Sequence, residues 1–192
     1  MINRKFFFDQ LRHSLFGGKI SKKQFEGMDT VLNEWEENNS KKDDRWLAYM
    51  LATTFHETAA TMQPIEEFGK GKARRYGKKI KMDGTTYNNT NNIFYGRGFV
   101  QLTWYENYET AGKKLKLDFI RDPGKVMELV NATKIMFLGM AEGWFTGKKL
   151  MDYFNPVKED WLNARRIING TDKAEKIAGY AKKFYAATSY TV

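Results

Sequence analysis

Apolar residues recur at helical spacing along most of the chain. Residues 3–16 carry an apolar stripe of this kind, and so does the segment that follows Ser21. Gly17 and Gly18 separate the two segments, and Ser21 belongs to the residue types that cap helix N-termini. The pattern therefore predicts two amphipathic helices at the start of the chain.

The least polar stretch runs from residue 45 to 67. Between residues 46 and 65 it carries one Asp, Glu, Lys or Arg, which is Glu57. At about 100° per residue, Glu57 lies close to the directions of Trp46 and Met50 on a helix. A carboxylate on the apolar side of a helix is costly unless it is paired or neutral. Glu57 is therefore the first candidate for a functional residue.

The rest of the chain predicts further helices around one polar, irregular middle. The Lys- and Arg-rich residues 70–81 and the Asn-rich run after them lack periodicity, which indicates loops with at most one short hairpin. The pattern of residues 95–103 predicts the one strand, in which successive side chains point to opposite faces and Phe99, Gln101 and Thr103 share one face. One helix should run from Asp43 or Asp44 to Pro64. Asp122-Pro123 should open a short helix, which a longer helix to about Gly143 follows. The last two helices should run from Asn155-Pro156 to Arg166 and from Asp172 onward.

No repeat or linker divides the chain. We predict a single domain over residues 1–192 that is mainly α with a minor β element. A hydrophobic content of 42% is that of a folded protein, and the absence of cysteine excludes disulfides, thiolate zinc sites and cysteine nucleophiles. The N-terminal segment has only a short apolar run, so we expect neither a signal peptide nor stable membrane insertion. We therefore expect that the protein is made in the cytoplasm.

Several chemistries can be removed. His56-Glu57 begins like the zinc motif HExxH, but Ala60 stands where the second histidine must be, and the only other histidine is His13. We therefore expect no metal and no cofactor. Residues 96–98 lack the third glycine of a dinucleotide loop, and the chain has neither a phosphate-binding loop nor a nucleophile elbow.

Carboxylate chemistry remains. Glycoside hydrolysis uses one carboxylic acid and a second carboxylate that activates water or attacks the sugar. Partly apolar surroundings suit Glu57 to the acid role. Glu67, with Glu66 beside it, lies where the chain turns polar, and nearby arginines such as Arg97 can keep it ionised. A buried Glu paired with an arginine for structural reasons is the alternative interpretation.

Four segments together resemble the family 19 glycoside hydrolases: HET at 56–58, EFG at 67–69, YGRGFVQLTWYENY at 95–108 and INGTDKA at 168–174. This family includes plant and bacterial chitinases and phage endolysins, and the chain is most similar to the short, single-domain branch. The resemblance covers roughly residues 3–188. It implies a lysozyme-like fold of two lobes with a central cleft, and inverting hydrolysis of β-1,4 links next to N-acetylglucosamine-type sugars.

The resemblance also implies roles for single residues. Glu57 corresponds to the general acid and Thr103 to the residue that holds the attacking water. Glu67 is our candidate for the second carboxylate, although the plant pattern places the base after a longer loop, so Glu66 stays open.

The candidate substrate-binding residues have alternatives too. Tyr95 is either core or a sugar platform, and the pair Arg165-Arg166 either lines the cleft or makes a structural ion pair. The full candidate set for substrate binding is Gln101, Asn107, Asn169, Tyr95, Arg97 and Arg166.

We therefore predict an endolysin-type glycosidase, a monomer that cleaves the β-1,4 bonds of peptidoglycan as a muramidase or N-acetylglucosaminidase does, after release to the cell wall. The net charge of +9 suits an anionic bacterial envelope. A chitinase acting on β-1,4-N-acetylglucosamine polymers is the alternative within the class, and a non-catalytic cell-wall sugar-binding protein is the alternative outside it. No recognition-helix motif supports nucleic-acid binding. For Glu57→Gln we expect lost activity and a melting temperature near or above that of the wild type.

Overall fold

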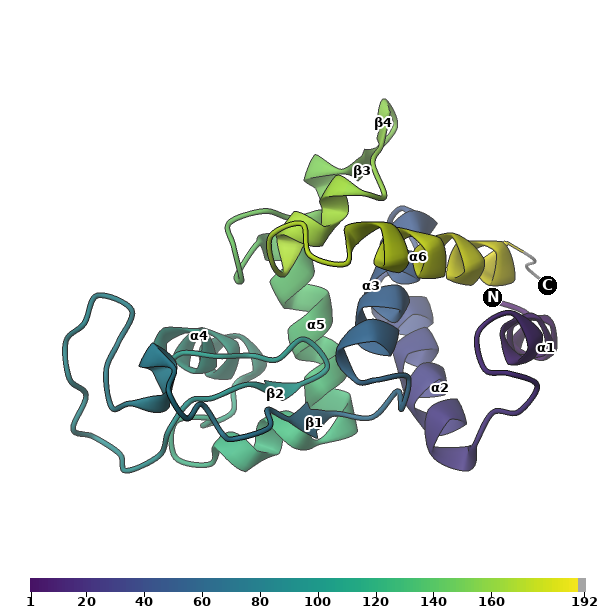
Figure 1. Ribbon diagram of the computed structural model, residues 1–192. Coiled ribbons are helices and arrows are strands. Elements are labelled where there is room, and N and C mark those ends of the chain that lie inside the picture. Colours follow the sequence, from purple (N-terminus) through teal and green to yellow (C-terminus); the bar gives the residue numbers. More distant parts are fainter. Residues whose placement is uncertain (190–192) are drawn as a thin grey trace.

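Six α-helices and two small sheets make up the computed structural model, which describes residues 1–189 (Figure 1). The α-helices are α1 (Arg4–Ser14), α2 (Lys22–Asn38), α3 (Asp44–Glu57), α4 (Tyr105–Leu115), α5 (Leu129–Glu142) and α6 (Ala174–Thr188). The antiparallel strand pairs are β1 (Ile65–Glu66) with β2 (Arg97–Gly98) and β3 (Phe154–Asn155) with β4 (Lys158–Glu159). Short 3-10 helices are η1 (Arg75–Gly77), η2 (Pro123–Met127), η3 (Leu150–Asp152) and η4 (Asn163–Ile167). The predicted class, mainly α with a minor β element, is confirmed.

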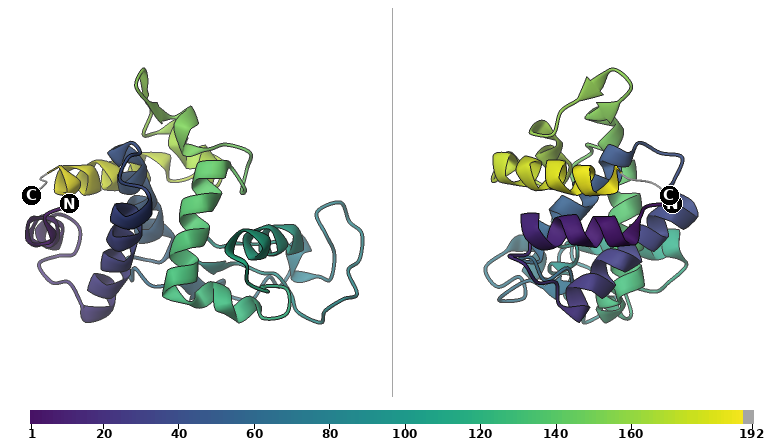
Figure 2. Two further views of the ribbon diagram at one scale, coloured as in Figure 1. Left: turned by 180° about the vertical axis from the view of Figure 1, so that it is seen from behind. Right: turned by 90° about the vertical axis from the view of Figure 1, so that its right-hand side faces the viewer.

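Helix α5 runs between two groups of elements (Figures 1 and 2). On one side, α3 packs along α6, and α1 and α2 complete a helical group. On the other side lie α4, the β1–β2 sheet and the long loops that join these two strands. The β3–β4 hairpin projects from the body of the molecule near the end of α5. This arrangement agrees with the predicted two-lobed fold.

Side-chain caps start two of the predicted helices. Ser21 Oγ accepts the N–H of Gln24 while the Gln24 side chain accepts the N–H of Ser21, which is a capping box at the start of α2. Asp43, rather than Asp44, caps α3 by accepting the N–H of Arg45. Both signals were legible in the sequence because a cap depends on local residues alone.

Helix α3 ends at Glu57, seven residues before the predicted end at Pro64, so that prediction is wrong. The Thr58 hydroxyl donates to a carbonyl one turn back and accepts the N–H of Met62, which draws the chain into a tight turn. The turn then crosses α2 at Gly27, where an added Cβ would lie 1.8 Å from the Met62 carbonyl oxygen. The glycine thus permits a close crossing that no local pattern reveals.

The predicted strand over residues 95–103 is also wrong in most of its length. Only Arg97 and Gly98 are in a strand, and the chain then folds back so that Arg97 and Leu102 exchange N–H···O=C bonds. Gln101 has a φ of +53°, in the left-handed region that a strand excludes. Phe99, which precedes the turn, is buried together with the residue after it, so the expected alternation of faces is lost.

A helix beginning at Asn155-Pro156 is a third wrong prediction, because these residues lie at the turn of the β3–β4 hairpin. Asn155 Oδ1 accepts the N–H of Val157, a local side-chain bond that favours a turn over a helix. The hairpin is followed by η4, which covers the end of the expected helix at Arg166.

Other boundaries agree with the pattern. Pro123 begins η2, α5 ends at Gly143 with a φ of +83°, and α6 begins at Ala174, close to the expected Asp172. Helix α4 had no counterpart in the predicted elements.

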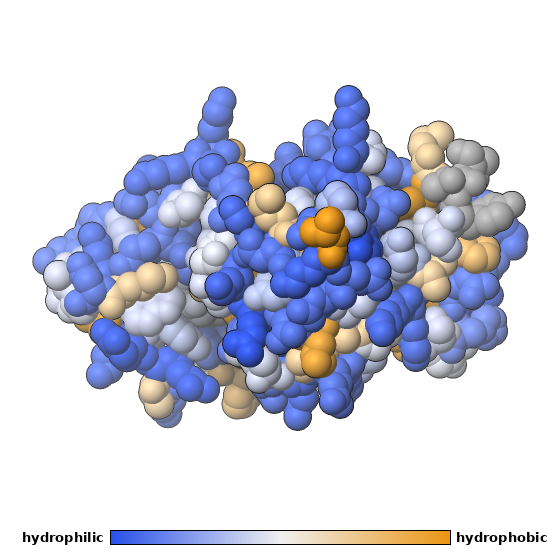
Figure 3. All heavy atoms as spheres, turned by 90° about the horizontal axis from the view of Figure 1, so that it is seen from above, coloured by the Kyte–Doolittle hydropathy of each residue, from blue (hydrophilic) through white to orange (hydrophobic). Residues whose placement is uncertain are grey.

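The face seen from above is mostly hydrophilic, with apolar residues in small separate patches (Figure 3). Two apolar side chains stand out by their exposure: Val157 at the hairpin and Phe68 after β1. Within residues 1–189, no helix combines the length and apolar character needed to cross a bilayer.

Candidate functional site

Glu57 is the last residue of α3 and its side chain is 18% exposed. Its Oε1 accepts a 2.6 Å hydrogen bond from Nη1 of Arg165, an η4 residue whose side chain is only 4% exposed. Nε of Arg165 donates in turn to the Asp172 carbonyl at 3.1 Å. The predicted apolar surroundings of Glu57 thus include a guanidinium. Within residues 1–189, Oε2 of Glu57 accepts no hydrogen bond and is the oxygen open to a ligand.

Two buried hydroxyls precede Glu57 on the same face of α3. Tyr49 and Thr53 lie two turns and one turn before Glu57, and their side-chain oxygens have no hydrogen-bond partner among the described residues. Burial raises the pKa of Tyr49 well above its usual value, and the Arg165 guanidinium opposes this effect. The face of α3 that leads to Glu57 therefore carries buried hydroxyl groups without a hydrogen-bond partner among the described residues.

Glu67 follows β1 and is held by two neutral donors. The Tyr76 hydroxyl donates to Oε1 at 2.8 Å, and the backbone N–H of Gly96 donates to Oε2 at 3.1 Å. Burial and the hydrogen bond to Glu67 raise the pKa of Tyr76 to about 12. A side chain at Gly96 would crowd Glu67, because a Cβ would lie 3.2 Å from the Glu67 Cβ and would also displace Oε1 of Gln101. The Glu67 carboxylate is thus fixed at both oxygens.

Glu66, the other candidate base, has a different environment. Its Oε1 accepts from the Tyr95 hydroxyl at 2.7 Å and from Nε of Arg97 at 3.2 Å, and Lys70 Nζ lies 3.6 Å from Oε2. The hydrogen bond from Tyr95, together with these two cations, holds the pKa of Glu66 below its usual range. Glu66 is therefore committed to ion pairs.

Tyr95 and Arg97 are both buried. The guanidinium of Arg97 lies 3.6 Å from the Tyr95 ring centre, and its Nη1 donates to the Tyr108 hydroxyl at 3.0 Å. Tyr108 donates in turn to the Tyr95 carbonyl at 2.7 Å. These contacts favour a supporting role beneath the β1–β2 sheet over direct contact with substrate.

Gln101 and Thr103 also lie on the β1–β2 side. Nε2 of Gln101 donates to the Ile65 carbonyl at 3.1 Å, so the Gln101 side chain links the turn after β2 to β1. Thr103 is half-buried and precedes Trp104, whose ring packs edge-on against Tyr76 with 5.8 Å between the ring centres. Because Tyr76 also bonds Glu67, the aromatic pair of Tyr76 and Trp104 connects the residue after Thr103 to Glu67.

Three predicted residues lie outside these contacts. Asn107 is a half-buried residue of α4, whereas Arg166 and Asn169 are exposed residues of η4 and the turn after it. The N–H of Asn169 donates to the carbonyl of Arg165, the partner of Glu57. The structure therefore connects Asn169 to Glu57 through Arg165 and places Gln101 and Glu67 on either side of Gly96. The exposed Arg166 bonds Asn163 instead.

Sequence reasoning did not separate Arg165 from Arg166 and did not single out Tyr76. Arg165 is 108 positions from Glu57, and Tyr76 lies in a loop without periodicity. Arg165 lies between Ala164 and the exposed Arg166, and no local sequence signal separates these two neighbouring arginines.

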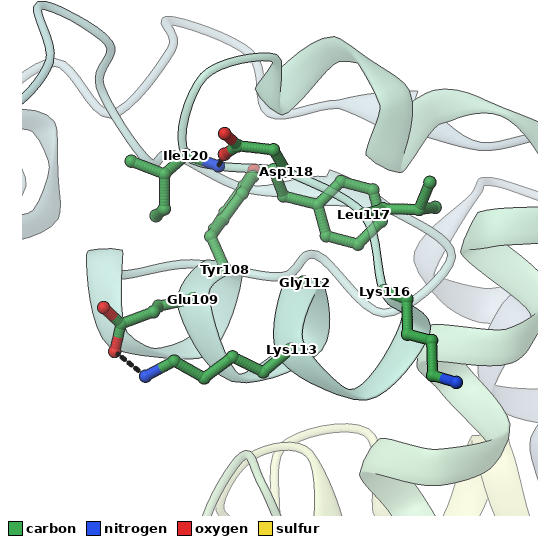
Figure 4. A pocket seen from close by; sticks show the side chains of 9 residues that line it. Tyr108, Glu109, Gly112, Lys113, Lys116, Leu117, Asp118 and Ile120 are labelled. Atoms are coloured by element: carbon green, nitrogen blue, oxygen red, sulfur yellow. Dashed lines mark hydrogen bonds and ion pairs between the residues drawn. The ribbon is translucent and has the colours of Figure 1, made fainter.

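A cavity of about 380 Å³ lies beside α4 and is lined by Tyr108, Glu109 and the segment around Asp118 (Figure 4). Its lining contains none of the predicted site residues, although the Tyr108 hydroxyl reaches Arg97. The central cleft of the predicted fold stays a prediction.

Comparisons with known proteins agree with the motifs. The family model for glycoside hydrolase family 19, described as chitinase class I, matches residues 20–152, more than half of the chain. An endochitinase of Arabidopsis thaliana is 39% identical over 83 residues. That match covers 43% of this chain and only 27% of the length of the relative.

Solved structures share the fold. Chitinase C from Streptomyces griseus aligns with a TM-score of 0.63 and 19% identity, over 99% of this chain and 77% of its own. A class IV chitinase from Zea mays aligns with a TM-score of 0.61 and 16% identity, over 98% of this chain and 93% of its own. With this fold and the family match over residues 20–152, the chain belongs to glycoside hydrolase family 19.

Proposed function

We propose that the protein hydrolyses β-1,4 bonds next to N-acetylglucosamine, with Glu57 as general acid and Glu67 as general base. The observation that carries the proposal is that each carboxylate is held by fixed donors, Glu57 by Arg165 and Glu67 by Tyr76 and Gly96. Chitin-type polymers are the proposed substrate because the relatives of known name are chitinases. This choice reverses the order expected from the sequence, which placed peptidoglycan first.

The acid step uses the two oxygens of Glu57 differently. Oε1 is engaged by Arg165, so Oε2 carries the proton and gives it to the leaving glycosidic oxygen. The guanidinium then stabilises the carboxylate that remains, by a charge-assisted hydrogen bond. Arg165 also fixes the direction of the Glu57 side chain.

The base step requires an ionised carboxylate that faces water. Each Glu67 oxygen accepts one hydrogen bond from the protein and keeps a further lone pair for the proton of the attacking water. The Thr103 hydroxyl holds that water. Glu66 is a poorer base because its charge is compensated by Arg97 and Lys70.

Hydrolysis of chitin oligomers by purified Glu57→Gln and Glu67→Gln variants tests this proposal. Each change should lower turnover by about 10²–10⁴-fold, whereas Glu175→Gln, at an exposed position of α6, should leave turnover at the wild-type level. Proton NMR of the first products should show the inverted anomer. Wild-type turnover in Glu57→Gln, or a retained anomer, would remove the assigned mechanism.

Peptidoglycan is the second candidate substrate, and the observation that favours it is the net charge of +9. In that case the enzyme acts at the bacterial wall after release from the cytoplasm. Mass analysis of fragments released from purified sacculi separates the two candidates, because the reducing-end sugar names the bond that was cut. Binding to either polymer without release of fragments would instead indicate a non-catalytic sugar-binding protein.

A further inference from the structure

A basic loop follows the candidate base. It comprises residues 70–81 and contains seven Lys or Arg residues and no Asp or Glu. Its cations are Lys70, Lys72, Arg74, Arg75, Lys78, Lys79 and Lys81. Within residues 1–189, Lys70 is the one member with a carboxylate within 4.0 Å, Glu66 at 3.6 Å. Of the other six, Lys79 donates to Asn91 Oδ1 at 3.1 Å, and Arg75 and Lys81 lie over the rings of Trp104 and Tyr105. Lys72, Arg74 and Lys78 have no such partner among the described residues and are exposed.

The backbone holds this loop in a defined shape. Gly71 and Gly77 pass each other so closely that a Cβ on Gly77 would lie 1.9 Å from the Gly71 carbonyl oxygen. Gly71 is buried, and a Cβ there would lie 3.1 Å from the Tyr95 Cβ. The crossing closes the segment between the two glycines and leaves Lys72 and Arg74 exposed on its outside. The charges are therefore presented by an ordered loop.

The basic loop is also connected to the proposed catalytic centre. Tyr76, inside the closed segment, donates its hydroxyl to Glu67, and the Arg75 guanidinium lies 5.7 Å from the Trp104 ring centre. Phe68, next to Glu67, is fully exposed and offers an apolar ring face beside the candidate base. Glu67 is therefore next in sequence to an exposed aromatic residue and is linked through Tyr76 to the basic loop.

We propose that the basic loop is an anion subsite that binds carboxylate groups carried by the glycan. This inference rests on the proposed function and specifies its substrate class, a β-1,4 N-acetylglucosamine-containing strand with acidic substituents. A neutral strand gives these cations nothing to pair with, whereas carboxylates along the strand gain charge-assisted contacts. The hydrogen bond from Tyr76 to Glu67 connects the loop to the proposed catalytic centre, which favours a glycan over nucleic acid as the occupant.

Two polymers with one backbone test the subsite: neutral glycol chitin and acidic carboxymethyl-chitin. The variant is Lys72→Gln/Arg74→Gln, because both side chains are exposed and unpaired among the described residues. The control, Lys22→Gln/Lys23→Gln, removes the same charge from the first turn of α2, on the other side of α5 (Figure 1). We expect the ratio of kcat/KM for carboxymethyl-chitin to that for glycol chitin to fall about fivefold in the loop variant at low salt. The control variant should keep the wild-type ratio. Added salt should lower this ratio in the wild type, because salt screens the contacts between the loop cations and the carboxylates.

An unchanged ratio in the loop variant, or an equal fall in the control, would overturn the inference. If the wild type cut neither polymer, the proposed function would fail separately, and binding of carboxymethyl-chitin by calorimetry would decide the subsite. Binding weakened by the loop variant and not by the control would then support the subsite, and equal binding by both would refute it. Loop-dependent retention on duplex DNA without loop-dependent binding of carboxymethyl-chitin would also refute it.

Discussion

The ion pair between Glu57 and Arg165 should contribute to the stability of the fold, and substitution of either residue measures that contribution. Arg165→Met removes the one donor to Glu57 among the described residues, and also the bond from Arg165 Nε to the Asp172 carbonyl. Methionine keeps much of the volume of the buried side chain. The main loss is therefore electrostatic rather than a cavity.

The magnitude follows from burial. Removing one partner of a fully buried ion pair costs about 3–5 kcal/mol. The Glu57 side chain is 18% exposed, so water relieves part of that cost, and we expect about 2–3 kcal/mol less free energy of unfolding for Arg165→Met. Glu57→Gln keeps an acceptor oxygen for Arg165 and loses only the charge assistance, which costs about 1 kcal/mol.

Urea unfolding of the two single variants and the double variant measures the coupling. The double variant should cost about 1–2 kcal/mol less than the sum of the singles, because no carboxylate is then left without a partner. Glu57→Gln should melt about 2–4 °C below the wild type. This differs from the sequence-based expectation of an unchanged or raised melting temperature, which did not place Arg165 against Glu57. Additive costs, or a cost below about 0.5 kcal/mol for Arg165→Met, would refute the ion pair as described.

Three further predictions follow from the same region. Tyr76→Phe removes one donor from Glu67 and should lower kcat on chitin oligomers about tenfold with little change in melting temperature; unchanged kcat would mean that Glu67 does not depend on Tyr76. Thr53→Val removes a buried hydroxyl without a partner among the described residues and should raise the free energy of unfolding by about 1 kcal/mol. A loss of stability in urea unfolding would instead indicate a bound water. Burial lowers the pKa of His56 below its usual 6.5, so the unfolded chain binds protons more readily than the folded one. The part of the stability that depends on His56 is complete above about pH 6.5 and is lost as the pH falls below it; His56→Gln should flatten this slope, and an unaltered slope would refute the assignment.

Local signals in the sequence predicted the elements that depend on local residues. The cap at Ser21 and the helix end at Gly143 are confirmed because each needs only neighbours along the chain. Helix α4 was missed because no side chain caps its start, where Trp104 has a φ of +72°, and because Gly112 interrupts its pattern.

The contacts that build the candidate site were not legible locally. Arg165 reaches Glu57 from 108 positions along the chain, and the Glu67 carboxylate takes its two donors from η1 and from the turn before β2. The identity of Glu57 and Glu67 as candidates came from motifs, whereas the groups that hold them came only from the fold.

The crossing at Gly27 has a consequence for how the molecule moves. Residues 58–66 are the only covalent tether between the proposed acid and base, and this tether is clamped beneath α2 and then stitched to β2. The backbone between Glu57 and Glu67 is thus held at two points, by α2 at Met62 and by β2 at residues 65 and 66. A motion that separates α2 from the β1–β2 sheet would have to break one of these two contacts.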